Sequence, residues 1–119
     1  MIGREDGADV AEQTSLHLTT TGRRTGAPRT IEIWFTGDAG RFYVISELGD
    51  RSHWVRNIRQ DRRVAVRVGA QRFRATARIL DEPADATRRR HVAALSEAKY
   101  GWGTGLIVEL HPADLHEPT

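Results

Sequence analysis

The chain has 119 residues, a formal net charge of +2 and no cysteine, which suits one domain and excludes disulfides and thiolate metal sites. Apolar residues make up 39% of the sequence, as in a folded globular protein, and no apolar run is long enough to cross a bilayer. The first residues are polar and acidic and lack the apolar stretch of a signal peptide, so a cytoplasmic protein is expected. We expect a short polar segment over residues 1–14, one domain over 15–111 and an irregular tail over 112–119.

Three strands are predicted in the first third of the chain. Apolar and polar side chains alternate over residues 15–20, 30–36 and 41–46, and the turn signal GDAG separates the last two segments. Alternation with period two is typical of strands with one buried face. We expect these three strands to form a meander.

The period changes after residue 50. Ser52 is a candidate N-cap for a helix that carries Trp54, Val55 and Ile58 on one face. Two strands follow within residues 62–80, where apolar residues alternate with arginines across a short GAQ loop. The last elements are a helix in DEPADATRRRHVAALSEAKYGWG and a strand over 105–110. These elements predict a mostly β (β+α) fold, a small barrel of six short, mainly antiparallel strands with two covering helices.

Positive charge is concentrated in parts of the chain. Arginine supplies 17 of the 18 basic residues and Lys99 the remaining one. The arginines cluster at residues 23–29, 51–78 and 88–90, whereas the acids lie mostly near the two ends and in DEPAD. This local excess of positive charge indicates an anionic partner.

The bend TGRRTGAPR between the first two strands has the composition of an anion cradle. Its glycines permit positive φ and close backbone approach, its arginines match phosphate or carboxylate geometry, and its threonine adds a hydroxyl donor. The expected cradle residues are Gly22, Arg23, Arg24, Thr25, Gly26, Pro28 and Arg29. A solvated hairpin tip that binds nothing is the alternative interpretation.

Other common site motifs are absent from the sequence. The five histidines show no metal-ligand spacing, so no metal site is predicted. The sequence has no Walker A loop, no G-x-G-x-x-G between a strand and a helix, and no nucleophile elbow.

Two segments resemble the deazaflavin-dependent nitroreductase family, whose members are split β-barrel flavin/deazaflavin oxidoreductases that use coenzyme F420. The segments are LTTTGRRTGAPRTIEIWF and GRFYVISELGDRSHWVRNIRQDRRVAVRV. The resemblance covers roughly residues 16–80, and KYGW at 99–102 also resembles the family. Its most specific part is the bend T-T-G-R-[RK]-[ST]-G-x-P-R followed about 25 residues later by W-x-x-N-[IL].

The resemblance implies that the bend holds the phosphate and acidic tail of F420. Arg24 and Arg29 match the family's basic phosphate contacts, and Arg23, Thr25, Gly26 and Pro28 lie beside them in the bend.

The resemblance also implies a place for the deazaflavin ring, at the end of the third strand. Backbone amides of Ser46, Glu47 and Leu48 would bind ring atoms there, although the family often has a basic residue where this chain has Glu47. The implied reaction is hydride transfer to a quinone, an enone or a nitro compound, with a proton from solvent, Ser46 or Tyr100.

In the family's helix motif, Trp54 and Asn57 correspond to residues beside the cofactor. We expect Trp54 to fill the core and Asn57 to brace the helix against neighbouring backbone. The family also implies a homodimer, for which Trp34, Tyr43 and Trp102 are candidate contacts.

Three alternative functions remain open from the sequence. The same fold could bind FMN, whose single phosphate also suits the bend. The alternating arginines of residues 63–78 could form a nucleic-acid-binding face, although the interleaved exposed aromatics needed for base stacking are missing, so no nucleic-acid partner and no membrane partner are predicted. The protein could also carry the cofactor without turnover.

Overall fold

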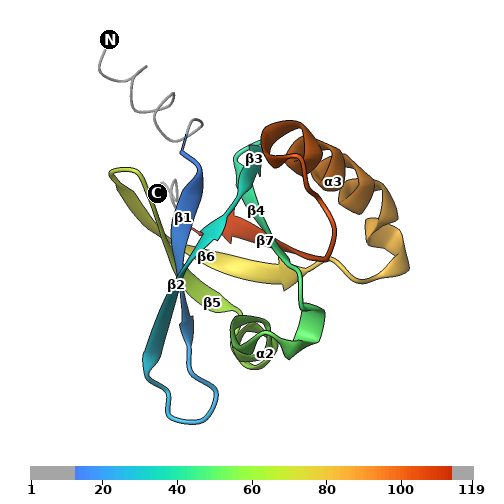
Figure 1. Cartoon of the computed structure of the whole chain (residues 1–119). Coiled ribbons are helices and arrows are strands. Elements are labelled where there is room, and N and C mark those ends of the chain that lie inside the picture. Colours follow the sequence, from blue (N-terminus) through green and yellow to red (C-terminus); the bar gives the residue numbers. More distant parts are fainter. Residues whose placement is uncertain (1–12, 114–119) are drawn as a thin grey trace.

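Seven strands form one antiparallel sheet in the computed structural model, which describes residues 13–113 (Figure 1). The strands are β1 (Ser15–Thr21), β2 (Pro28–Trp34), β3 (Thr36–Asp38), β4 (Arg41–Ser46), β5 (Arg63–Val68), β6 (Gln71–Ile79) and β7 (Leu106–Pro112). The predicted mostly β fold is confirmed. β7 extends one residue into the segment expected to be an irregular tail, and residues 1–12 and 114–119 lie outside the described part of the chain.

The expected meander of the first three strands is wrong. The order across the sheet is β2-β1-β5-β6-β7-β4-β3, so the β1–β2 and β3–β4 hairpins lie at opposite edges. Only Phe35 separates β2 from β3 in the chain. The two edges are therefore joined covalently, and the sheet must curl into an open barrel (Figure 1).

The strand count differs from the expected six because the segment 30–36 divides at Phe35. The hydroxyl of Tyr100 accepts a hydrogen bond from the Phe35 N–H at 3.0 Å, and Lys99 Nζ donates to the Phe35 carbonyl at 3.0 Å. Side chains at the end of the distant helix Ala86–Tyr100 thus take the backbone groups that a neighbouring strand would otherwise use. The strand is interrupted there and changes partner.

Two α-helices lie toward opposite ends of the curled sheet (Figure 1). α2 (His53–Gln60) follows the short 3-10 helix η1 (Gly49–Arg51), and α3 (Ala86–Tyr100) follows η2 (Pro83–Asp85). Ser52 occupies the predicted N-cap position of α2, but its side chain makes no cap hydrogen bond. Gly101 ends α3 in the left-handed conformation at φ 77°, which glycine adopts without strain.

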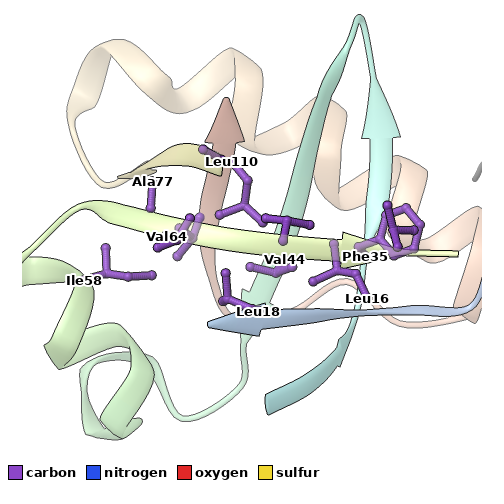
Figure 2. Packing of buried hydrophobic residues seen from close by; sticks show 12 residues of the cluster. Leu16, Leu18, Phe35, Val44, Ile58, Val64, Ala77 and Leu110 are labelled. Atoms are coloured by element: carbon purple, nitrogen blue, oxygen red, sulfur yellow. The ribbon is translucent and has the colours of Figure 1, made fainter. Parts of the chain in front are cut away.

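The core is filled by the apolar faces of the strands and closed by α2 (Figure 2). Leu16 and Leu18 of β1 pack with Val44 of β4 and Leu110 of β7, and Ile58 from α2 joins them. A second buried cluster under α3 contains Tyr43, Ile45, Leu80, Val92 and Ile107. The alternation read from the sequence matches the buried and exposed positions of β1 and β5.

No helix within residues 13–113 is long and apolar enough to span a membrane.

Candidate functional site

The arginine-rich bend is a compact loop between β1 and β2. The Gly22 N–H donates to the Ala27 carbonyl at 2.7 Å, and the Gly26 N–H donates to the Gly22 carbonyl at 2.8 Å. Thr25 Oγ1 accepts from the Ala27 N–H at 3.2 Å, while Gly26 has a φ of 77°, where a glycine is favoured. The loop is therefore held largely by its own backbone, without using the side chains of Arg24 and Arg29.

Asn57 of α2 fastens this loop to the barrel. Its Oδ1 accepts from the backbone N–H of Arg23 at 3.2 Å and from Arg23 Nη1 at 2.9 Å. Its Nδ2 donates to Thr20 Oγ1 of β1 at 3.0 Å. Both Asn57 and Thr20 are buried, so each hydrogen bond satisfies a polar group that burial would otherwise penalise. The family motif W-x-x-N thus supports the bend from behind, as expected for Asn57.

The arginines of the bend have no acidic partner among residues 13–113. Five other arginines in the described chain have an acidic partner: Arg59 bridges Asp50 and Asp81, for example. Arg24 and Arg29 are exposed and make no hydrogen bond or ion pair with residues 13–113, while Arg23 reaches only Asn57 and His53. Within residues 13–113, the bend therefore carries positive charge that no acid neutralises.

These groups border a hollow of about 410 Å³ between the bend and α2. We call it the loop hollow. Its predicted lining residues are Arg23, Arg24, Thr25, Arg29, Trp54 and Asn57. Trp54 also packs against the core, so it both fills the barrel and forms one wall, while Gly26 and Pro28 shape the loop without lining the hollow.

The surroundings of Gly22, which is buried, provide a test of whether this hollow suits an anion. A Cβ placed there would lie 3.4 Å from both Arg29 Nε and Thr25 Oγ1, and 3.0 Å from the Ala27 carbonyl oxygen. A guanidinium donor and a hydroxyl donor therefore converge over a backbone that has no side chain. Such donors match a phosphate or carboxylate group, so the residues present fit the anionic part of a cofactor.

A second hollow, of about 500 Å³, lies further along the chain of β2, towards Trp34. We call it the aromatic hollow. Its rim is formed by Glu32, Trp34, Glu47, Tyr100 and Trp102. Trp34 stacks on Tyr100 with ring centroids 4.5 Å apart and contacts Trp102 edge-on at 6.4 Å.

The loop after α3 presents Trp102 to this hollow. Ser96 Oγ donates to the Trp102 carbonyl at 2.5 Å. A Cβ at Gly103 would lie 2.6 Å from the Ala93 carbonyl oxygen, so only glycine permits this close approach to α3. Trp102 itself packs on the buried cluster beneath α3. Its ring is therefore held in place by the fold.

Tyr100 is fixed in the wall of the aromatic hollow. Its hydroxyl accepts from the Phe35 N–H and lies 2.5 Å and 2.6 Å from the carbonyl oxygens of Phe35 and Thr14, to one of which it donates. Burial raises the pKa of Tyr100, although the Phe35 backbone opposes this. Burial lowers the pKa of neighbouring Lys99.

The three residues predicted to hold the deazaflavin ring, at the turn after β4, lie in different surroundings. Ser46 is buried, and its hydroxyl donates to the Gly49 carbonyl at 2.9 Å and lies 2.7 Å from Ser52 Oγ. Glu47 is exposed and lines the aromatic hollow. Leu48 is 56% exposed and lines neither hollow.

Several lining residues escaped the sequence analysis. In the loop hollow they are Thr20, Ile31 and His53, and in the aromatic hollow Glu32 is the one with a charge. His53 directly precedes the W-x-x-N motif, and its Nδ1 lies 3.4 Å from Arg23 Nη2. Its position beside that motif was the only feature of the sequence that could have identified His53 as a lining residue. No feature of the sequence pointed to Glu32.

Tyr43 does not suit the dimer contact expected for it. Its side chain is 1% exposed and donates to Glu109 Oε2 at 2.9 Å. Trp34, by contrast, is 47% exposed.

The family model described as F420H2-dependent quinone reductase matches residues 2–108. The chain belongs to this family. It is therefore an F420-dependent reductase, and the resemblance noted in the sequence is confirmed.

Solved structures support the same split-barrel fold. An F420-H2-dependent reductase is 22% identical with a TM-score of 0.67, and the match covers 82% of this chain and 94% of that chain. A putative pyridoxamine 5′-phosphate oxidase from Listeria innocua is 14% identical with a TM-score of 0.70, over 96% and 95% of the two chains. A structure described as a domain-swapped dimer is 23% identical with a TM-score of 0.67, over 89% and 86%. At these identities the similarity establishes the fold alone.

Within residues 13–113, no group of three or more histidine, aspartate or glutamate side chains is placed to hold a metal ion.

Proposed function

We propose that the loop hollow holds the phosphate and acidic tail of F420 and that the aromatic hollow receives a quinone-like acceptor. The observation that carries the first half is the convergence over Gly22 of donors from Thr25 and from Arg29, an arginine with no acidic partner within residues 13–113. The second half is supported by the stacked Trp34 and Tyr100 beside Trp102, since aromatic walls bind flat, electron-poor rings by stacking.

One strand serves both hollows. Ile31 of β2 lines the loop hollow, while Glu32, Ile33 and Trp34 line the aromatic hollow. At about 3.3 Å per residue, Ile31 and Trp34 are roughly 10 Å apart along the strand. A cofactor anchored by its tail in the loop hollow therefore needs to extend only along β2 to approach the acceptor.

The chemistry requires few protein groups. When bound, reduced F420 supplies a hydride, which together with one proton reduces a quinone to a hydroquinone and leaves the cofactor oxidised. The protein's part is to grip the tail through Arg24 and Arg29 and to hold the acceptor ring against fixed aromatic side chains.

Solvent is the simplest proton source for this reaction. Of the two side chains predicted to donate a proton, Tyr100 lines the aromatic hollow and Ser46 does not. Both hydroxyls are hydrogen-bonded to backbone carbonyls, so each would have to give up that contact in order to donate.

Cofactor titration tests this proposal. Trp54 lines the loop hollow, so its fluorescence should be quenched as F420 binds. FMN serves as the comparison ligand, and a panel of quinones, enones and nitro compounds with reduced F420 identifies the acceptor class. Tight binding of FMN without binding of F420 would contradict the cofactor assignment. Binding of F420 without oxidation by any acceptor would indicate a carrier.

We also propose that the protein forms a homodimer. Leu48 is a large apolar side chain that remains 56% exposed, and burying such a group favours association. Light scattering of the purified protein gives the mass directly, and a monomeric mass at micromolar concentration would contradict this proposal.

A further inference from the structure

We infer that the aromatic hollow selects acceptors that carry a positive charge beside their planar ring. This inference rests on the proposed function, because it assigns a substrate class to the hollow proposed for the acceptor. Its basis is the charge and the aromatic surface of the hollow.

The charged side chains lining this hollow are acidic. Glu32 projects from β2 and Glu47 follows β4, and both are exposed. Glu32 Oε2 accepts from Ser15 Oγ at 2.6 Å, and Glu47 makes no hydrogen bond or ion pair with residues 13–113. No arginine, lysine or histidine is among the described lining residues. Among residues 13–113, neither carboxylate therefore has an ion-pair partner, and the same is true of the arginines in the loop hollow.

The aromatic wall adds to this preference for a cation. Trp34 is 47% exposed although it stacks on Tyr100, so part of its ring surface remains open to a ligand. Indole is the aromatic side chain that binds cations best over its face. Trp102 lies at an interplanar angle of 75° to Trp34, so the hollow offers ring surfaces in two directions. Aromatic faces together with carboxylates are the combination that binds quaternary or protonated amines.

The charge of such an acceptor also suits the reaction. Hydride transfer adds a pair of electrons to the acceptor ring, and nearby carboxylates oppose the build-up of negative charge on a neutral acceptor. A cationic substituent offsets that repulsion and is itself attracted to Glu32 and Glu47. Electrons and atoms balance as for any quinone: the acceptor gains a hydride and one proton, and the substituent is unchanged.

Three matched naphthoquinones test the inference by activity. They carry, at the same ring position, a trimethylammonioethyl group, its neutral 3,3-dimethylbutyl isostere, or a sulfonatoethyl group. We expect kcat/KM with reduced F420 to be about 3- to 10-fold higher for the cation than for the neutral isostere, and lowest for the anion. In the double variant Glu32→Gln/Glu47→Gln the cation should lose this advantage. Glu97→Gln is the matched control, because Glu97 is an exposed α3 carboxylate that does not line the hollow.

A second measurement requires neither cofactor nor turnover. Naphthylmethyl-trimethylammonium and its neutral tert-butyl analogue are titrated against the protein, with quenching of tryptophan fluorescence as the signal. We expect the cation to bind more tightly by a similar factor, and more weakly as salt is added. The Trp54→Phe background removes the signal from the loop hollow.

The outcomes separate this inference from the proposed function. Equal binding of the cation and the neutral analogue, or a preference that persists in the double glutamine variant, overturns the inference. Failure of reduced F420 to reduce any acceptor, together with a cation preference in the titration, overturns the proposed function and supports the inference. Turnover of all three quinones without charge preference supports the proposed function and overturns the inference.

Discussion

The loop hollow and the aromatic hollow lie along the same strand, yet they are built in opposite ways. The loop hollow has three arginines without an acidic partner in the described chain, on a loop held by backbone hydrogen bonds and Asn57. The aromatic hollow has two carboxylates and a wall of rings fixed by α3. The loop hollow presents charge on long arginine side chains, and the aromatic hollow presents ring surfaces whose positions are fixed by packing.

This difference suggests a division of labour. Long arginine side chains can adapt to a charged tail, and charge-assisted hydrogen bonds supply the affinity. A reacting ring needs a defined position, because misplacement by about 1 Å costs roughly 100-fold in rate. Mutations in one hollow should therefore change cofactor affinity, and mutations in the other should change acceptor use.

The largest expected effect is in the loop hollow. Arg24→Ala combined with Arg29→Ala should weaken F420 binding by about 3 kcal/mol or more, roughly 100-fold, at about 1.5–3 kcal/mol for each charged hydrogen bond lost. The melting temperature should change little, because both side chains are exposed and have no partner within residues 13–113. Fluorescence titration measures the affinity.

A matched control for that variant is Arg67→Ala combined with Arg72→Ala. These arginines are also exposed and without an intramolecular partner among residues 13–113, but they lie opposite each other on β5 and β6. F420 affinity should stay at the wild-type value. Equal losses in the two double variants would mean that net charge, and not the loop, governs binding.

Removing Asn57, which fastens the loop to the barrel, should have the next largest effect. Asn57→Ala leaves Thr20 Oγ1 and the backbone N–H of Arg23 without their partner, which should cost about 2–3 kcal/mol of unfolding free energy. Urea unfolding measures this cost, with Gln60→Ala, an exposed change on the same helix, as the control. F420 affinity should also fall, because the loop loses its anchor. A wild-type urea midpoint in Asn57→Ala would show that the brace is not structural.

The loop hollow could be predicted from the sequence in large part. Its arginines and threonine lie within one short segment, and the W-x-x-N motif supplied the opposite wall. Local composition is sufficient there because most of the contacts form within the loop. His53 and Ile31 were missed because their roles depend on how α2 and β2 pack against that loop.

The aromatic hollow could be predicted only in part, because it is assembled from distant segments. Glu32 and Glu47 meet there because the chain folds back after β3, and alternation alone does not reveal such a return. The same limit explains the wrong meander and the missed strand break. That break depends on Lys99 and Tyr100, more than 60 residues away in the sequence, binding the backbone of Phe35.

Tyr43, a buried residue that lines the aromatic hollow, should affect the stability of the protein at alkaline pH. Burial, and then the hydrogen bond to Glu109, raises the pKa of Tyr43 from 10.0 to about 12. A raised pKa in the folded state stabilises the protein fully below pH 10, and this contribution disappears as the pH rises from 10 to 12. The urea midpoint should fall over that range, because the free energy of unfolding loses up to about 3 kcal/mol from this group.

Tyr43→Phe separates this effect from other alkaline titrations. The variant should be less stable than wild type at pH 8, because Glu109 loses a hydrogen-bond donor, and its midpoint should depend less steeply on pH above 10. Tyr100, whose pKa is also raised, contributes in the same direction in both proteins. Identical slopes in the two proteins would mean that Tyr43 does not control alkaline stability.

The smallest expected effect is in the aromatic hollow, where a mutation should change acceptor use and leave F420 affinity unchanged. Trp34→Ala removes the ring that stacks on Tyr100 and should lower kcat/KM for a quinone about 3- to 10-fold, since such aromatic pairs contribute about 0.5–1.5 kcal/mol. F420 affinity should not change, because Trp34 does not line the loop hollow. Trp34→Phe keeps a ring on Tyr100 and should recover most of the loss, in steady-state assays with saturating reduced F420. If Trp34→Ala instead weakened F420 binding and left acceptor kinetics intact, the division of labour between the two hollows would be wrong, and the cofactor would have to occupy the aromatic hollow.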